Sequence, residues 1–103
     1  MKTIISGRFV DTSRYDFKND KGEDFSLCKI ILLDEDEVRD DFKTKAYKVT
    51  KECFLSSGFD NKEFTSKIVS HNVILSGVSR SVYKKLKSLW IVEFLGTSIT
   101  VEK

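Results

Sequence analysis

The chain has 103 residues, of which 40% are hydrophobic, 12% aromatic and 33% charged, and its formal net charge is +2. This size and composition argue against disorder and predict one domain, residues 1–103, with a single packed core. The longest apolar runs, residues 30–33 and 89–92, are far shorter than the roughly 20 residues of a membrane-spanning helix. The start of the chain turns polar and charged before an apolar run develops, so we expect no export signal and a cytoplasmic protein without membrane contact.

Cysteine and histidine are scarce: the chain contains only Cys28, Cys53 and His71. Without an export signal, the two thiols are expected to stay reduced and buried. The spacing of the three residues matches no zinc motif. There is also no glycine-rich phosphate loop, no nucleophile elbow and no partner for His71 in nucleophilic catalysis. We therefore predict a binding protein rather than an enzyme, with no metal and no cofactor.

The first third of the chain predicts a long β-hairpin. From Thr3 to Phe17 the chain is rich in β-branched and aromatic residues, as long strands are, and Gly7 within this segment predicts a bulge or a sharp coil. Residues 19–24 supply the asparagine, aspartate and glycine of a turn. Apolar residues then occupy both alternate sets of positions between residues 25 and 33. This second strand is therefore expected inside the sheet.

A helix is expected in the middle of the chain, where the spacing of apolar residues changes. Phe64 and Ile68 fall four residues apart, as on one face of a helix. Asp60, followed three residues later by Glu63, has the form of a helix start. We predict one short helix over about residues 61–70.

Three further strands complete the pattern. One covers about residues 44–50, another begins at residues 73–75 and is interrupted at Gly77, and the last covers residues 89–101 and bends at Gly96. Five strands with a helix between the third and fourth is the element order of the OB-fold. We therefore predict a mostly β protein, a five-stranded OB-like Greek-key barrel with one short helix between strands 3 and 4. An SH3-like barrel or an α+β roll uses similar parts.

Charged residues are arranged in blocks of one sign. The run from Asp34 to Asp41 holds six carboxylates and one arginine, residues 42–51 hold four lysines and no acid, and residues 79–88 hold one arginine and three lysines. Such blocks create local fields that the net charge conceals, although each block can also be a solvated face. The acidic run lacks the ligand spacing of a calcium loop and is expected to be an exposed connection.

Aromatic residues are interleaved with basic ones in three segments. Proteins that hold single-stranded nucleic acid combine a cationic groove with aromatic planes on which bases stack. Phe17 and Phe25 are assigned to core packing, whereas Tyr15 and Tyr83 have charged neighbours and fit either role. The predicted nucleic-acid-binding residues, expected along one wall of the sheet, are Arg14, Tyr15, Lys18, Lys21, Lys45, Tyr47, Lys48, Arg80, Tyr83, Lys84, Lys85 and Lys87.

Several short runs in the first half of the chain resemble one known family. They are Ser6-Gly7-Arg8-Phe9, Tyr15-Asp16-Phe17, Asn19-Asp20-Lys21-Gly22-Glu23, Lys29-Ile30-Ile31-Leu32-Leu33-Asp34 and Tyr47-Lys48-Val49. In this order they resemble the small single-stranded-DNA-binding proteins of filamentous and other bacteriophages and of related mobile elements, the gene V-like proteins.

The resemblance implies an OB-type barrel, a protruding hairpin that grips DNA, cooperative coating of the strand during replication, and a homodimer. It matches Tyr15, Lys18 and Lys21 with the gripping hairpin, and Tyr47 and Lys48 with the strand that faces the groove. A long bulged hairpin also offers an exposed edge, and a second subunit often covers such edges.

Two functions follow as alternatives. The first is largely sequence-independent binding of single-stranded nucleic acid in phage or mobile-element replication. The second is a protein-interaction module or inhibitor of a host nucleic-acid machine, in which the run from Asp34 to Asp41 binds a basic protein partner.

Overall fold

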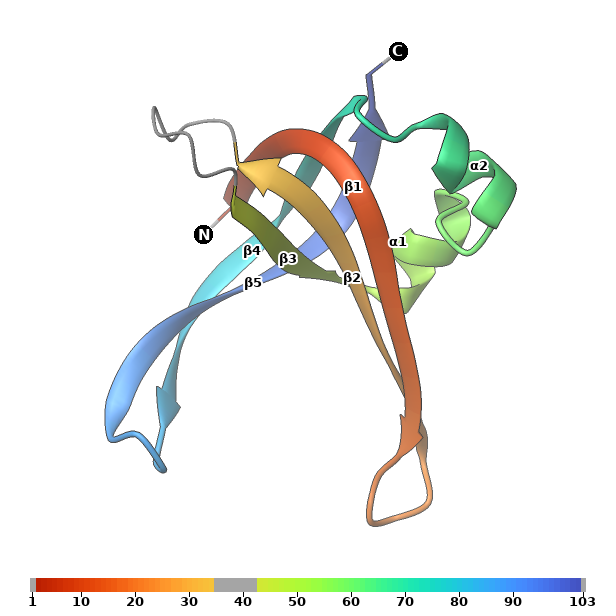
Figure 1. Cartoon of the computed structure of the whole chain (residues 1–103). Helices are drawn as coiled ribbons and strands as arrows, with labels where there is room; N and C mark the ends of the chain where they lie inside the picture. Colours follow the sequence, from red (N-terminus) through yellow and green to blue (C-terminus); the bar gives the residue numbers. More distant parts are fainter. Residues whose placement is uncertain (1, 35–42, 103) are drawn as a thin grey trace.

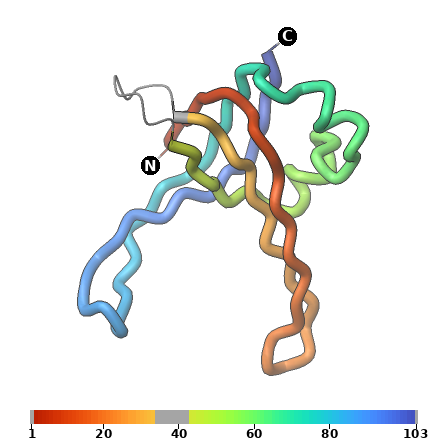
Figure 2. Tube along the Cα trace, in the orientation of Figure 1, coloured from red at the N-terminus to blue at the C-terminus, as the bar shows by residue number. Residues whose placement is uncertain are grey.

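Five strands of this protein close into a barrel in the order β1-β2-β3-β5-β4, and two short helices join β3 to β4 (Figures 1 and 2). The structure is a computed structural model and describes residues 2–34 and 43–102. It confirms the prediction of a mostly β, OB-like barrel. The elements are β1 (Lys2–Lys18), β2 (Asp24–Asp34), β3 (Lys43–Val49), α1 (Lys51–Ser56), α2 (Lys62–Lys67), β4 (Asn72–Lys84) and β5 (Leu89–Val101).

β1 is long enough to change partners along its length. Its first residues pair with β4, and after Arg8 it pairs with β2, both antiparallel. The register shifts between Phe9 and Asp11, so the bulge predicted at Gly7 lies a few residues further on. Gly7 has a different role: a Cβ there would lie 2.8 Å from the carbonyl oxygen of Leu33, and only glycine allows β1 and β2 to approach this closely.

The barrel interior is apolar throughout the described residues. Phe9, Phe54 and Phe59 are its largest side chains, and the ring of Phe59 contacts the other two. Cys28 and Cys53 are free thiols and both are buried, which confirms the prediction for the cysteines. Burial raises the pKa of both thiols, so they remain protonated at neutral pH.

Two helices occupy the region where one was predicted. The first was missed because Thr50 ends the β-rich segment; its hydroxyl accepts a hydrogen bond from the Cys53 amide (3.2 Å) and caps α1. The second helix begins at Asn61 rather than at Asp60, because the Asn61 side chain accepts hydrogen bonds from two amides of the first turn. It ends before Ser70, whose φ of 72° is incompatible with a helix.

β4 does not stop at Gly77, contrary to the prediction. A Cβ at Gly77 would lie 2.0 Å from the carbonyl oxygen of Leu95, so glycine is required for β4 to approach β5 this closely at the register shift between Ser76 and Gly77. β4 then pairs with β5 as far as Lys84, opposite Leu89. The glycine marks a close approach of two paired strands rather than the end of one.

Two hairpins extend beyond the barrel on the same side, with β3 at their junction (Figure 1). We call residues 13–29, from β1 and β2, the first arm, and residues 78–95, from β4 and β5, the second arm. Among the described residues, β3 and β5 are parallel and form one pair, Val49 with Gly96. Beyond this pair, no further backbone pairing joins the second arm to β3 in the described structure.

Two predictions bear on other parts of the chain. No helix within the described ranges is long and apolar enough to cross a membrane. The acidic run lies outside the described residues apart from Asp34, whose backbone ends β2. Its proposed binding of a basic protein partner therefore stays a prediction.

Candidate nucleic-acid interface

Strand register divides each arm into two faces, because residues directly opposite each other on paired strands point to the same side of the sheet. The buried residues Cys28, Ile30 and Leu32 define the face toward the core, which we call the inner face. The residues that alternate with these in the strand, such as Lys29 and Ile31, form the outer face. The same alternation continues into both arms, where the core no longer covers the inner face.

Three aromatic rings form a continuous stack on the outer face of the first arm. Tyr15 and Phe17 have ring centroids 5.8 Å apart with planes 21° apart, and Phe17 and Phe25 are also 5.8 Å apart at 19°. These side chains are 65%, 41% and 45% exposed, respectively. We call the three residues the aromatic ladder. The assignment of Phe17 and Phe25 to the core is wrong, because the hairpin extends past the barrel and nothing in the described structure covers this face.

Charged residues occupy the inner face of the first arm and are largely paired with one another. Asp16 accepts hydrogen bonds from the hydroxyl of Ser26 (2.6 Å) and from Nε of Arg14 (3.1 Å). These bonds, Ser26 first, lower the pKa of Asp16. Lys18 Nζ lies 4.0 Å from an oxygen of Asp24. Much of the positive charge predicted for this hairpin is therefore balanced by carboxylates.

The outer face of β2 and β3 carries two lysines side by side at the foot of the arms. Lys29 is directly opposite Lys48 in the register of paired residues. Tyr47, by contrast, belongs to the inner face, packs against the core and contacts the ring of Phe94 edge-on at 6.1 Å. The register places Lys45 on the inner face as well.

The second arm reverses the arrangement of the first. Its outer face carries Arg80 opposite Glu93, and Lys84, whose Nζ lies 3.0 Å from Oε1 of Glu93. Its inner face carries Tyr83 opposite Trp90, with ring centroids 5.4 Å apart. The indole of Trp90 is 70% exposed, so this pair is a second aromatic surface.

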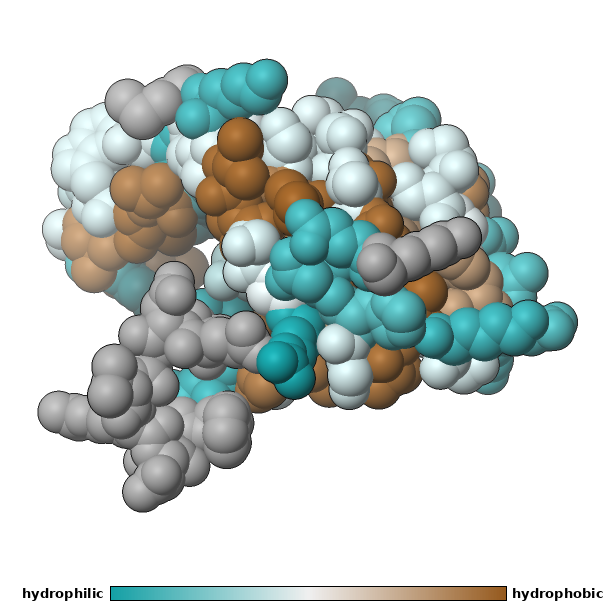
Figure 3. All heavy atoms as spheres, turned by 90° about the horizontal axis from the view of Figure 1, so that it is seen from above, coloured by the Kyte–Doolittle hydropathy of each residue, from teal (hydrophilic) through white to brown (hydrophobic). Residues whose placement is uncertain are grey.

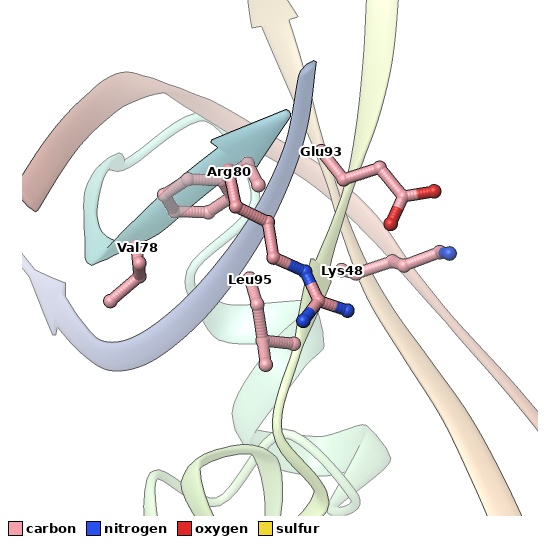
Figure 4. A pocket seen from close by; sticks show the side chains of 6 residues that line it. Lys48, Val78, Arg80, Glu93 and Leu95 are labelled. Carbon is pink, nitrogen blue, oxygen red and sulfur yellow. The ribbon is translucent and has the colours of Figure 1, made fainter. Parts of the chain in front are cut away.

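A pocket of about 330 Å³ lies where β3 meets the second arm (Figure 4). The hydrogen bond from Lys84, and then the nearby charges of Lys48 and Arg80, lower the pKa of Glu93 and keep it ionised at neutral pH. A second pocket at the same junction also includes Lys48, Glu93 and Phe94. The residues that line the first pocket are Lys48, Val78, Arg80, Glu93, Phe94 and Leu95.

The predicted binding residues do not form one wall. Those on the outer face are Tyr15, Lys48, Arg80 and Lys84. Those on the inner face are Arg14, Lys18, Lys45, Tyr47 and Tyr83. The turns at the ends of the two arms carry Lys21, Lys85 and Lys87.

Sequence reasoning missed five residues of this surface: Phe17, Phe25, Lys29, Trp90 and Glu93. Lys29 carried a usable signal, because it is the one charged residue between residues 25 and 33 and so marks the exposed side of an otherwise apolar strand. The sequence around Trp90 carried no signal of exposure, because its neighbours Leu89 and Ile91 are apolar, as in a buried strand. Its exposure follows only from the length of the second arm.

Other parts of the described surface offer weaker candidates. No group of three histidine, cysteine, aspartate or glutamate side chains in residues 2–34 and 43–102 is placed to hold a metal ion. His71 Nδ1 lies 3.3 Å from the carbonyl oxygen of Glu102, so it contacts the end of the chain. From above, apolar residues are visible between hydrophilic ones (Figure 3). Exposed apolar side chains outside the arms include that of Ile4, at 67%.

No protein-family model and no curated protein sequence matches this chain. Solved structures do. Two crystal structures of the mitochondrial single-stranded DNA binding protein Rim1 from S. cerevisiae match it with TM-scores of 0.59 and 0.52, at 10% and 11% identity, and each match covers 99% of this chain and 93% of that protein. A small single-stranded DNA binding protein from Mycoplasma pneumoniae has a TM-score of 0.48 at 10% identity, over 96% of this chain and 90% of its own.

At these identities the likeness to the yeast protein concerns the fold. It extends over nearly the whole of both chains. The side chains on the arms have to be judged on their own geometry.

Proposed function

We propose that this protein binds single-stranded DNA without catalysing a reaction and largely without sequence preference. The observation that carries the proposal is the aromatic ladder: three rings stacked in parallel and exposed on an arm that extends beyond the barrel. An exposed stack of this kind is costly in water unless a partner covers it. Unpaired bases are flat, apolar on their faces and suited to continue the stack.

The charges near the ladder support a path for the sugar-phosphate backbone. Lys29 and Lys48 adjoin each other on the outer face of β2 and β3, the surface with which OB barrels bind oligonucleotides. Lys48 also borders the pockets beside the second arm. A strand stacked on the ladder therefore continues over the lysine pair toward the second arm. The lysines in the turns at the ends of the two arms add further positive charge to this side of the molecule.

The fold likeness supports the same class of ligand. The yeast mitochondrial protein is by its name a single-stranded DNA binding protein, and its fold is similar to that of this chain over nearly the whole of both. Together with the resemblance of the first half of the chain to phage proteins, this leads us to propose a role in coating single-stranded DNA during phage or mobile-element replication.

We further propose a homodimer as the working unit. Beyond residue 11, β1 pairs with β2 alone in the described structure, so one edge of the first arm is available to a second copy. Light scattering of the free protein tests this proposal, and a monomeric mass at all concentrations would contradict it.

Fluorescence anisotropy of a labelled dT oligomer tests the binding function directly. An oligomer of about 16 nucleotides, the upper end of the range for one OB barrel, is long enough. We expect saturable binding at about 50 mM salt and clearly weaker binding at about 200 mM, because each phosphate contact releases counterions. The same sequence as a duplex serves as the control and should bind more weakly, since its bases cannot stack on the ladder. Absence of binding to the single strand at low salt would overturn the proposal.

A further inference from the structure

The pocket between β3 and the second arm combines apolar walls with both signs of charge (Figure 4). Val78, Leu95 and the ring of Phe94 form its apolar part. Lys48 and Arg80 contribute hydrogen-bond donors, and Glu93 contributes acceptors. Its volume of about 330 Å³ lies within the range of pockets that hold small ligands.

Glu93 is the one acidic residue among those that line this pocket, and a carboxylate is not expected in a site for phosphate alone. Its side chain is only 27% exposed, and Lys84 holds one of its oxygens at 3.0 Å. A phosphate in the pocket would lie close to the negative charge of this carboxylate as well as to Lys48 and Arg80, whereas a neutral ligand is not repelled by Glu93. A carboxylate has room for several hydrogen bonds. The salt bridge to Lys84 therefore leaves capacity for N–H donors of a neutral ligand.

Among the DNA bases, guanine suits this set of groups best. Its N1–H and N2–H₂ groups are adjacent donors that one carboxylate can accept, and its O6 and N7 atoms are the acceptors that arginine and lysine most often contact. Thymine presents two carbonyl oxygens around a single N–H, and these oxygens would face the charge of Glu93. The apolar walls then cover the faces of the ring.

We propose that this pocket binds guanine, with Glu93 accepting from N1–H and N2–H₂ and Arg80 donating to O6 and N7. The inference rests on the proposed binding of single-stranded DNA and adds one base-selective position to an otherwise unselective surface. Lys48, from the outer face of β3, also lines the pocket, where it can hold the adjoining phosphate.

Competition anisotropy with two unlabelled oligomers tests the proposal. One is a dT oligomer, and the other is identical except for one central guanine, which cannot self-associate as guanine runs do. We expect the guanine-containing oligomer to bind roughly tenfold tighter to the wild-type protein, the gain typical of a good bidentate base contact. In the Glu93→Gln variant the two oligomers should bind equally, because an amide cannot accept from both guanine donors.

The matched control is Glu63→Gln on α2. Glu63 is also paired with a lysine, Lys67, at 3.5 Å, so both variants remove one carboxylate from a lysine salt bridge and change the net charge equally. The control should keep the preference for guanine. Circular dichroism checks that both variants are folded.

The outcomes separate this inference from the proposed function. Equal binding of the two oligomers by the wild-type protein, a preference that persists in Glu93→Gln, or a preference for a cytosine-substituted oligomer over the guanine one would overturn the guanine pocket while leaving single-stranded DNA binding intact. Failure of both oligomers to bind would overturn both proposals.

Discussion

The two arms are both two-stranded hairpins, yet they distribute rings and charges in opposite ways. The first arm places its rings on the outer face and its charges on the inner face, where Arg14 is paired with Asp16. The second arm places Arg80 and Lys84 on the outer face and the Tyr83–Trp90 pair on the inner one. The difference shows that one face of a sheet combines residues from neighbouring strands, and not residues that are adjacent in one strand.

The reason is the two-residue period of a strand. Arg14 and Tyr15 adjoin in sequence, as do Tyr83 and Lys84, and adjacent residues in a strand point to opposite faces. Basic and aromatic neighbours therefore cannot serve the same face. Aromatic and basic side chains share a face only where they come from alternate positions or from different strands. The aromatic ladder and the Lys29–Lys48 pair share the outer face in this way.

The largest effect is expected from removing the ladder. The double variant Tyr15→Ala/Phe17→Ala should weaken dT binding by at least roughly 30-fold, because each stacking ring contributes ~1–3 kcal/mol per base. Both side chains are exposed, so the fold should be unaffected. Anisotropy titrations at low salt measure the weakening.

Two control variants test whether the loss of binding comes from the rings of the ladder. Tyr15→Phe keeps the ring and should bind as the wild type does. Val69→Ala removes an exposed apolar side chain outside the arms and should also leave binding unchanged. An unchanged dissociation constant in the double variant would mean that the ladder serves another partner.

A smaller effect, visible chiefly in the salt dependence, is expected from the lysines between the arms. For Lys29→Gln/Lys48→Gln we expect the slope of log K against log salt to become shallower by about 1.4, because each single-strand phosphate that a lysine neutralises accounts for about 0.7 of the slope. Titrations at several salt concentrations measure it. The double variant of Lys62 and Lys67, both exposed on α2, removes the same charge, and an equal change of slope there would argue against a defined path.

The second arm should contribute less than the first, because it offers one ring pair instead of three stacked rings. For Trp90→Ala we expect roughly fivefold weaker binding, the lower end of the contribution of one stacked base. Trp90 is the only tryptophan, so quenching of its emission on addition of unlabelled dT oligomer reports the same interaction. A weakening greater than that of the ladder variant would reverse the ranking of the arms.

The smallest effect concerns the charges on the inner face of the first arm. Hydrogen bonds from Ser26 and Arg14 lower the pKa of Asp16 below its usual value of 3.8, so folding favours the ionised carboxylate. Its contribution to stability is complete above that value and is lost as the pH falls through the lowered pKa. The melting temperature of Asp16→Asn should therefore lie slightly below that of the wild type near pH 7.

The same difference in melting temperature should shrink at low pH, once the pH has fallen through the lowered pKa and the wild-type carboxyl is protonated as well. Asp60→Asn removes an exposed carboxylate outside the arms and serves as the control. A difference that is the same at both pH values would show that Asp16 acts through packing rather than through its charge.

The strands could be predicted well from the sequence, and the helices less well. All five strands were placed, the second from apolar residues at both alternate sets of positions and the fourth from the apolar run at residues 73–75. The first helix was missed because a single threonine, Thr50, ends a strand-like run and caps a helix of only six residues, too short for a helical period to stand out. Gly77 looked like an interruption of a strand, although its missing side chain allows two paired strands to approach closely.

The candidate site was only partly predictable. Tyr15 and Lys48 were identified from their basic and aromatic neighbours, whereas Phe17, Phe25 and Trp90 resembled core residues by type. Whether such a ring is buried depends on how far its strand extends past the barrel. That length is set by pairing with a distant partner, as between Phe17 and Phe25 or between Tyr83 and Trp90.

By itself the sequence determined that this chain forms strands, how many, and which residues alternate on them, because these properties follow from the period of two and from local turn chemistry. The tertiary structure decided which of the two alternate faces is covered, where β3 and β5 close the barrel at Val49 and Gly96, and how far the arms extend beyond it. These depend on contacts between residues far apart in the chain, and they turn ordinary hydrophobic residues such as Phe17 into an exposed stacking surface.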